Sequence, residues 1–233
     1  MTDVAAIPGF FQPVSSLSHL LAAVVALVGA RSLVKRGRGN TVTMALLGVY
    51  VFCVVVTLGI SGAYHSLAER TLARALMQRL DYYAIWLLIA GTFTAVHGIM
   101  FKGPFWRTGM LIFIWAYACT GIFLQIIRFD IFSGVPGLLL YLGLGWTGTL
   151  SIVKMGRQVG FQRVWPFWCA GLAYTAGAVL EAVGHPVVIA RWVGPHEVFH
   201  FAVIIGVTLH WLFIHRYVNG HASLTPLLAK TPA

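Results

Sequence analysis

Long apolar segments constrain this chain more than any other feature. A transmembrane helix needs about 20 mainly apolar residues, and seven segments of the sequence meet that requirement. They cover residues 17–34, 43–65, 81–100, 108–127, 132–153, 166–186 and 195–215. Only 9% of the residues are charged, against roughly 25% in soluble domains, so the chain could not cover a water-facing surface. The sequence therefore predicts an all-α membrane protein: one seven-helix transmembrane bundle over residues 1–233, with a flexible tail at 217–233.

The net charge of +10 does not indicate a nucleic-acid-binding protein. Basic residues form short clusters between the apolar segments, as in RSLVKRGR at 31–38 and KMGRQVGFQR at 154–163. Such clusters are typical of loops that lie beside anionic lipid headgroups. The expected partners are membrane lipids, including a lipid substrate or ligand, and no nucleic acid.

Polar side chains inside membrane spans are costly, so each one is a candidate for function. With seven spans, most of these residues fall toward one end of the bundle, because the chain alternates between the two ends. The residues on this end, here called side A, are His19, Ser61, His65, Asp81, Glu181, His185, His196, Glu197 and His200. His97 and His210 fall toward the opposite end. The arrangement depends on the span count, since removal of one span would separate His65 from His196.

The spacing of the side A histidines predicts a metal site. His196 and His200 are four residues apart, so they share one helix face, and Ser61 and His65 share a face in the same way. Three neutral imidazoles from two helices can bind zinc and leave one position open for water. Zinc lowers the pKa of that water and polarises a carbonyl group. Asp81 would then orient or deprotonate the water, and Ser61 would donate a hydrogen bond to a developing oxyanion.

The remaining side A residues each have two interpretations. His19 and His185 are either hydrogen-bonded helix contacts or residues that support the metal ligands. Glu181 and His185 share a helix face by their four-residue spacing and are expected to form a hydrogen bond. Glu197 is either a supporting partner of His196 or an acidic residue of the first helical turn. The alternative role of Asp81 is a carboxylate at a helix N-terminus, facing the helix dipole.

The segment GPHEVFH at 194–200 also matches the His-Glu-x-x-His pattern of zinc metalloproteases. A protease of that kind needs a third ligand after the motif. The histidines that follow are directed toward the opposite end of the bundle: His210, His215 and His221. The protease interpretation therefore lacks its third ligand.

Three segments together resemble the hemolysin III family. They are SGAYH (61–65), LDYYAIWLLIAGTFTA (80–95) and GPHEVFHFAV (194–203). This family comprises bacterial relatives of the adiponectin and progestin receptors, within a superfamily that also includes the alkaline ceramidases. The resemblance covers nearly the whole chain and implies seven transmembrane helices around a zinc ion, in a bacterial plasma membrane.

By matching motif positions, the resemblance implies that His65, His196 and His200 bind the zinc, with Ser61 and Asp81 close to it. Glu197 would not be required, because the family motif specifies only the two histidines.

Two features depart from the family pattern. Family members usually carry Glu and Asn before the first-span histidine, where this chain has Gln12 and Ser15 nearby. The second departure is the charge distribution. Of the 16 Lys and Arg residues, only five lie in side A loops: Arg70, Arg74, Arg79, Arg128 and Arg191. The positive-inside rule then places side A outside the cytoplasm, whereas the adiponectin receptors have their zinc site facing it. We follow the charge rule.

The function predicted first is hydrolysis of a lipid amide, such as a ceramide, by a zinc-activated water. A second interpretation is a sensor or receptor in which the zinc is structural and holds the second and seventh spans together. A third is a pore-forming hemolysin, as the family name suggests. A pore predicts a polar stripe through several spans, and the polar residues gather at one end instead.

Overall fold

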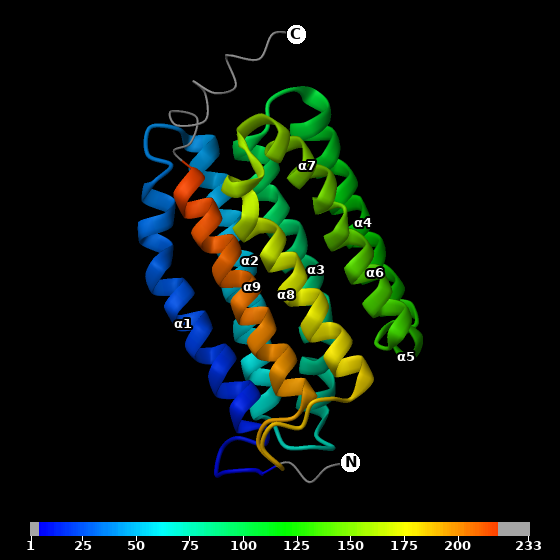
Figure 1. The fold of residues 1–233 in the computed structure, drawn as a ribbon. Coiled ribbons are helices and arrows are strands. Elements are labelled where there is room, and N and C mark those ends of the chain that lie inside the picture. Colours follow the sequence, from blue (N-terminus) through cyan, green and yellow to red (C-terminus); the bar gives the residue numbers. More distant parts are fainter. Residues whose placement is uncertain (1–4, 219–233) are drawn as a thin grey trace.

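The computed structural model describes residues 5–218 and shows long helices lying side by side along a common direction (Figure 1). The elements are α1 (Pro13–Lys35), α2 (Thr41–Ser66), α3 (Leu72–Met100), η1 (Phe105–Gly109), α4 (Met110–Ile127), α5 (Phe129–Phe132), α6 (Val135–Trp146), α7 (Gly148–Val159), α8 (Phe161–Val183) and α9 (Pro195–Tyr217). Short elements join the long ones: η1 leads directly into α4, and α7 continues α6 after Thr147. The described residues are thus helical, as the sequence predicts.

Local signals explain where several helices begin and end. The Asn40 side chain accepts a hydrogen bond from the Thr43 N–H and caps α2, and Thr71 accepts one from Arg74 to cap α3. α3 therefore begins at Leu72, earlier than the expected position 81, since the polar segment before the apolar one is also helical. α8 ends at Val183, and the next residue, Gly184, has a φ of +77°, the left-handed conformation that glycine adopts without strain.

Apolar side chains lie on both the inner and the outer surfaces of the bundle. α3 is the central helix, and its Trp86 and Ala90 are completely buried. Large apolar side chains on other helices are exposed, among them Val28, Phe52 and Ile112. Helices that are apolar all round suit a lipid environment. The described residues thus form an integral, multi-pass membrane protein.

Within residues 5–218, six helical segments are long and apolar enough to cross a membrane, which is one fewer than the sequence predicts. They are α1, α2, α3, η1 with α4, α6 with α7, and α9. The expected span at 166–186 corresponds to α8, which is as long as α1 and α9. Its Gln162, Arg163 and Glu181 lower its mean hydropathy. The fold is therefore multi-pass and helical, whereas the count of seven spans stays a prediction.

The predicted flexible tail begins at 217, but Tyr217 ends α9 and both it and Val218 are buried. The rest of that segment, 219–233, lies outside the described residues.

Candidate metal centre

One end of the bundle collects the residues that the sequence assigns to side A. There α2 and α8 end, and α1, α3 and α9 begin (Figure 1). The ligand candidates come from the last turn of α2 and the first two turns of α9. Because these helices are far apart in sequence, only their packing brings the histidines together.

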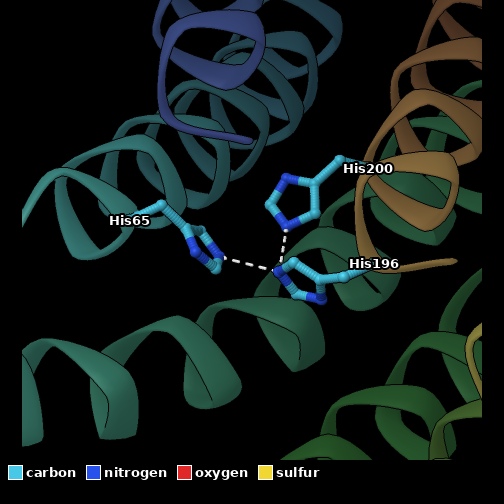
Figure 2. Close-up of side chains that lie close together, drawn as sticks. All are labelled: His65, His196 and His200. Atoms are coloured by element: carbon cyan, nitrogen blue, oxygen red, sulfur yellow. Dashed lines mark hydrogen bonds between the residues drawn. The ribbon is translucent and has the colours of Figure 1, made fainter. Parts of the chain in front are cut away.

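His65, His196 and His200 point toward one another (Figure 2). Nε2 of His196 lies 3.4 Å from Nε2 of His65 and 3.0 Å from Nε2 of His200. The three candidate ligand atoms all lie within 4.8 Å of one another. His65 and His200 are buried, and His196 is partly buried. The group could hold a metal ion.

Two of the three separations between these nitrogens fit a tetrahedral ion. With Zn–N bonds of about 2.0–2.1 Å, two nitrogen ligands of a tetrahedral site lie about 3.3 Å apart. The two measured Nε2 separations, 3.4 and 3.0 Å, are close to that value. The donor set of three imidazoles also suits a transition metal better than calcium or magnesium, which prefer oxygen ligands.

Gln12 orients the His65 ring. Its side-chain oxygen Oε1 lies 2.6 Å from Nδ1 of His65, and its backbone N–H donates to the His65 carbonyl at 3.0 Å. Because an amide oxygen can only accept, Nδ1 of His65 carries the proton. Its Nε2 therefore presents a lone pair toward the other two histidines, as a metal ligand requires.

Glu181 does the same for His196. Its Oε1 lies 2.7 Å from Nδ1 of His196, across the contact between α8 and α9. A carboxylate that accepts from Nδ1 fixes the tautomer and raises the basicity of Nε2, an arrangement typical of metal-binding histidines. Glu181 was predicted only as a supporting candidate, and the structure gives it this specific contact.

His19 packs against the third histidine. The ring centroids of His19 and His200 are 4.0 Å apart, and Nε2 of His19 donates a long hydrogen bond, 3.4 Å, to the backbone carbonyl of His200. Both side chains are buried. His19 thus makes a hydrogen-bonded contact with the helix turn that carries His200, and its supporting role at a metal site stays a prediction.

Asp81 and Ser61 belong to the same end of the bundle as the histidines. The Asp81 carboxyl faces the Ser61 hydroxyl, and His196 and Glu181 are further polar groups in its surroundings. Ser61 is buried one turn before His65 on α2. Asp81 lies well inside α3, whose first residue is Leu72, so it does not occupy the helix N-terminus that its alternative interpretation required.

Glu197 contacts α1 and its own helix start. Its Oε1 accepts from the Ser15 hydroxyl at 2.9 Å, and its Oε2 accepts from the Gly194 N–H at 3.0 Å. These contacts make Glu197 an acidic residue of the first turn, which caps α9. Both oxygens are thus engaged with the helix start and with α1.

The structure places His97, His185 and His210 away from the cluster. His185 was a supporting candidate expected to pair with Glu181 on one helix face. That pairing is wrong, because α8 ends at Val183 and His185 follows with an exposed side chain. His97 donates to the Trp106 carbonyl at 2.6 Å and contacts Ser151 at 2.9 Å. His210 packs against Phe167.

Sequence reasoning did not assign a role to Gln12 or Ser15. Both residues depart from the family pattern. Their place before the first-span histidine, where family members carry Glu and Asn, is the feature that could have indicated a role. In the structure, Gln12 contacts the candidate ligand His65, and Ser15 contacts Glu197.

The fold and the histidine cluster define a helical, multi-pass membrane protein with a candidate metal site at one end of its bundle. The family model for haemolysin-III-related proteins matches residues 12–211. The chain belongs to the hemolysin III family, which confirms the resemblance drawn from the sequence. It is similar to Hemolysin-3 of Bacillus cereus, with 25% identity over 90% of this chain and 92% of that protein. A bacterial plasma membrane, as expected, agrees with this relative.

Proposed function

We propose that His65, His196 and His200 bind a zinc ion, and that the site hydrolyses the amide bond of a membrane lipid such as a ceramide. The observation that carries the proposal is the convergence of three histidines: Nε2 of His196 lies 3.4 and 3.0 Å from Nε2 of His65 and of His200, and all three candidate ligand atoms lie within 4.8 Å of one another. Two of the three rings are held with Nδ1 as donor by Gln12 and Glu181, which leaves their Nε2 lone pairs available.

Bound zinc would supply an activated water and polarise a carbonyl group. The Asp81 carboxylate would take the proton from the attacking water, since His196 is among the charged groups that act on it. The Ser61 hydroxyl, next to Asp81, would donate to the carbonyl oxygen as negative charge develops on it. The protonated Asp81 would then return the proton to the leaving amine.

The substrate class rests on two arguments. The cluster lies at the end of helices whose outer surfaces are apolar, so lipids are the molecules nearest to it. The choice of an amide bond follows from the resemblance to the superfamily that includes the alkaline ceramidases.

Our proposal includes α8 as the seventh membrane span. Its 23 residues are about 35 Å long, enough to cross a hydrocarbon core of about 30 Å. Trp168, Leu172 and Val179 are exposed on its surface. A crossing by α8 also agrees with Glu181 and His196 meeting at the same end of the bundle.

A second candidate function is a sensor in which the metal is structural. The ligands come from two helices, α2 and α9, so a bound ion would join them. Metal removal would then unfold the protein, whereas removal from a hydrolase would abolish activity in a bundle that stays folded.

The first test is the metal content of the purified protein by mass spectrometry, without chelator. We expect about one zinc per chain, lost in His196→Ala and His200→Ala. His185→Ala is the matched control, because that histidine is exposed and lies outside the cluster. Wild-type protein without metal would contradict the zinc site.

The second test separates catalysis from metal binding. Asp81→Asn should keep its zinc and lose hydrolysis of a labelled ceramide, by about 10²- to 10⁴-fold, because a general base is removed. Retained hydrolysis in Asp81→Asn would contradict the role of Asp81 as the general base. No hydrolysis by zinc-loaded wild type across amide lipids would contradict the hydrolase and favour the sensor.

A further inference from the structure

Arg74 does not touch the three histidines, but it contacts Gln12, which in turn contacts His65. Its Nη2 donates to Oε1 of Gln12 at 2.7 Å, and its Nη1 donates to the Leu67 carbonyl at 2.5 Å. The guanidinium stacks over the rings of Phe11 at 5.0 Å and Tyr64 at 4.7 Å. These contacts hold the side chain between the segment before α1, the end of α2 and the start of α3.

The same oxygen of Gln12 therefore receives two hydrogen bonds, one from Arg74 and one from His65. A glutamine side chain has an accepting oxygen at one end and a donating NH₂ at the other. Arginine can only donate. If the Gln12 amide were rotated by half a turn, its NH₂ would face the Arg74 donor, so this rotation is disfavoured.

We propose that Arg74 is a positioning residue for His65 and acts through Gln12. By holding the Gln12 oxygen toward the cluster, Arg74 forces His65 to donate from Nδ1 and to present Nε2 as a ligand. The proposal rests on the proposed metal site for its consequence, which is tighter metal binding. Its immediate effect, the choice of His65 tautomer, does not require a bound ion.

Arg74 also has a purely structural alternative. Its bond to the Leu67 carbonyl lies at the C-terminal end of α2, where a basic side chain commonly satisfies free carbonyls. In that role, loss of Arg74 would lower stability and leave the metal affinity of the folded protein unchanged. The two roles can therefore be separated by measuring both quantities.

The sign of the change in zinc affinity also distinguishes the two roles of Arg74. Removal of a positive charge near the cluster should by itself strengthen the binding of a cation. The proposal predicts the opposite sign for Arg74→Met: an affinity for zinc about 10-fold weaker or more, the range found when supporting contacts to metal ligands are lost. Arg79→Met is the matched control, because Arg79 belongs to the same helix but stacks over Phe129.

A double-mutant cycle with Gln12→Glu tests the route through Gln12. A carboxylate accepts at both oxygens, so it needs no arginine to select its orientation. The loss caused by Arg74→Met should therefore be much smaller in the Gln12→Glu background, and the cycle removes the additive effect of the new charge. Affinities would be measured on full-length protein in detergent by competition with a zinc chelator, alongside thermal unfolding.

The tautomer of His65 gives an independent readout. Nitrogen NMR of histidine-labelled protein, with His65→Gln to assign the signal, should show Nδ1–H in the wild type and a mixture in Arg74→Met. Unchanged tautomer and affinity in Arg74→Met relative to Arg79→Met would overturn the proposal. If the wild type bound no zinc, the proposed function would fail, and the tautomer measurement would still decide the role of Arg74.

Discussion

The Glu181 carboxylate accepts a hydrogen bond from Nδ1 of His196 at 2.7 Å, and so connects the end of α8 to the beginning of α9. The two residues are 15 positions apart in sequence, separated by a loop that turns the chain back on itself. The contact makes α8 part of the candidate metal centre, although none of the three candidate ligands belongs to that helix.

Removal of the Glu181 carboxylate should weaken metal binding. We expect Glu181→Leu to lower the zinc affinity by about 10- to 100-fold, because His196 loses the acceptor that fixes its tautomer and raises its basicity. Chelator competition measures the effect. His185→Leu serves as the comparison, since His185 is close in sequence and exposed. An equal loss in both variants would argue against the Glu181–His196 contact.

Glu197 should prove to be a helix cap rather than a catalytic base. Glu197→Gln keeps one accepting oxygen and loses one of the two hydrogen bonds. The free energy of unfolding should therefore fall by about 1 kcal/mol. Ser15→Ala removes the hydroxyl that donates to Oε1 of Glu197 and should lower the free energy of unfolding by a similar amount. Thermal unfolding and zinc content measure the outcome. A Glu197→Gln variant that stays folded and zinc-loaded but loses all hydrolysis would support the protease-like role instead.

Close packing of α2 against α3 should make Gly91 intolerant of a side chain. A Cβ at Gly91 would lie 2.6 Å from Cβ of Cys53, which cannot be accommodated without movement of one helix. Gly91→Ala should therefore destabilise the protein by about 1–3 kcal/mol. Gly145→Ala should be nearly neutral, because no neighbouring atom lies within 4 Å of its added Cβ. Thermal unfolding of both variants in detergent tests the difference.

The distribution of basic residues predicts that the metal centre faces away from the cytoplasm. In a background in which Cys53, Cys119 and Cys169 are replaced by alanine, Ala68→Cys should react with a membrane-impermeant thiol reagent added to intact cells. Thr41→Cys, at the start of α2 and thus at the other end, should react only after the membrane is opened. Both positions are exposed. The reverse labelling pattern would place the site on the cytoplasmic side, as in the adiponectin receptors.

Much of the fold followed from properties that are local in sequence. Apolar segments of membrane-spanning length predict helices, because backbone groups in lipid must pair within their own segment. The expected segment at 43–65 corresponds to α2 (Thr41–Ser66), and 195–215 corresponds to α9 (Pro195–Tyr217). The four-residue spacing of His196 and His200 also predicts a shared face, since helical geometry fixes it. The helix positions and the shared face of the two histidines thus depend only on residues within a few turns of one helix.

The partners of the ligands depended on how helix ends pack together. Glu181 pairs with His196 and not with His185, because Gly184 ends α8 before the expected helix face is complete. Gln12 reaches His65 because the segment before α1 lies against the end of α2. Apolar segment lengths and helical spacing were thus sufficient to predict a helical membrane protein and its three candidate ligands. The side chains that orient those ligands became known from the folded bundle, since loop paths and helix contacts are long-range features that spacing along the chain does not encode.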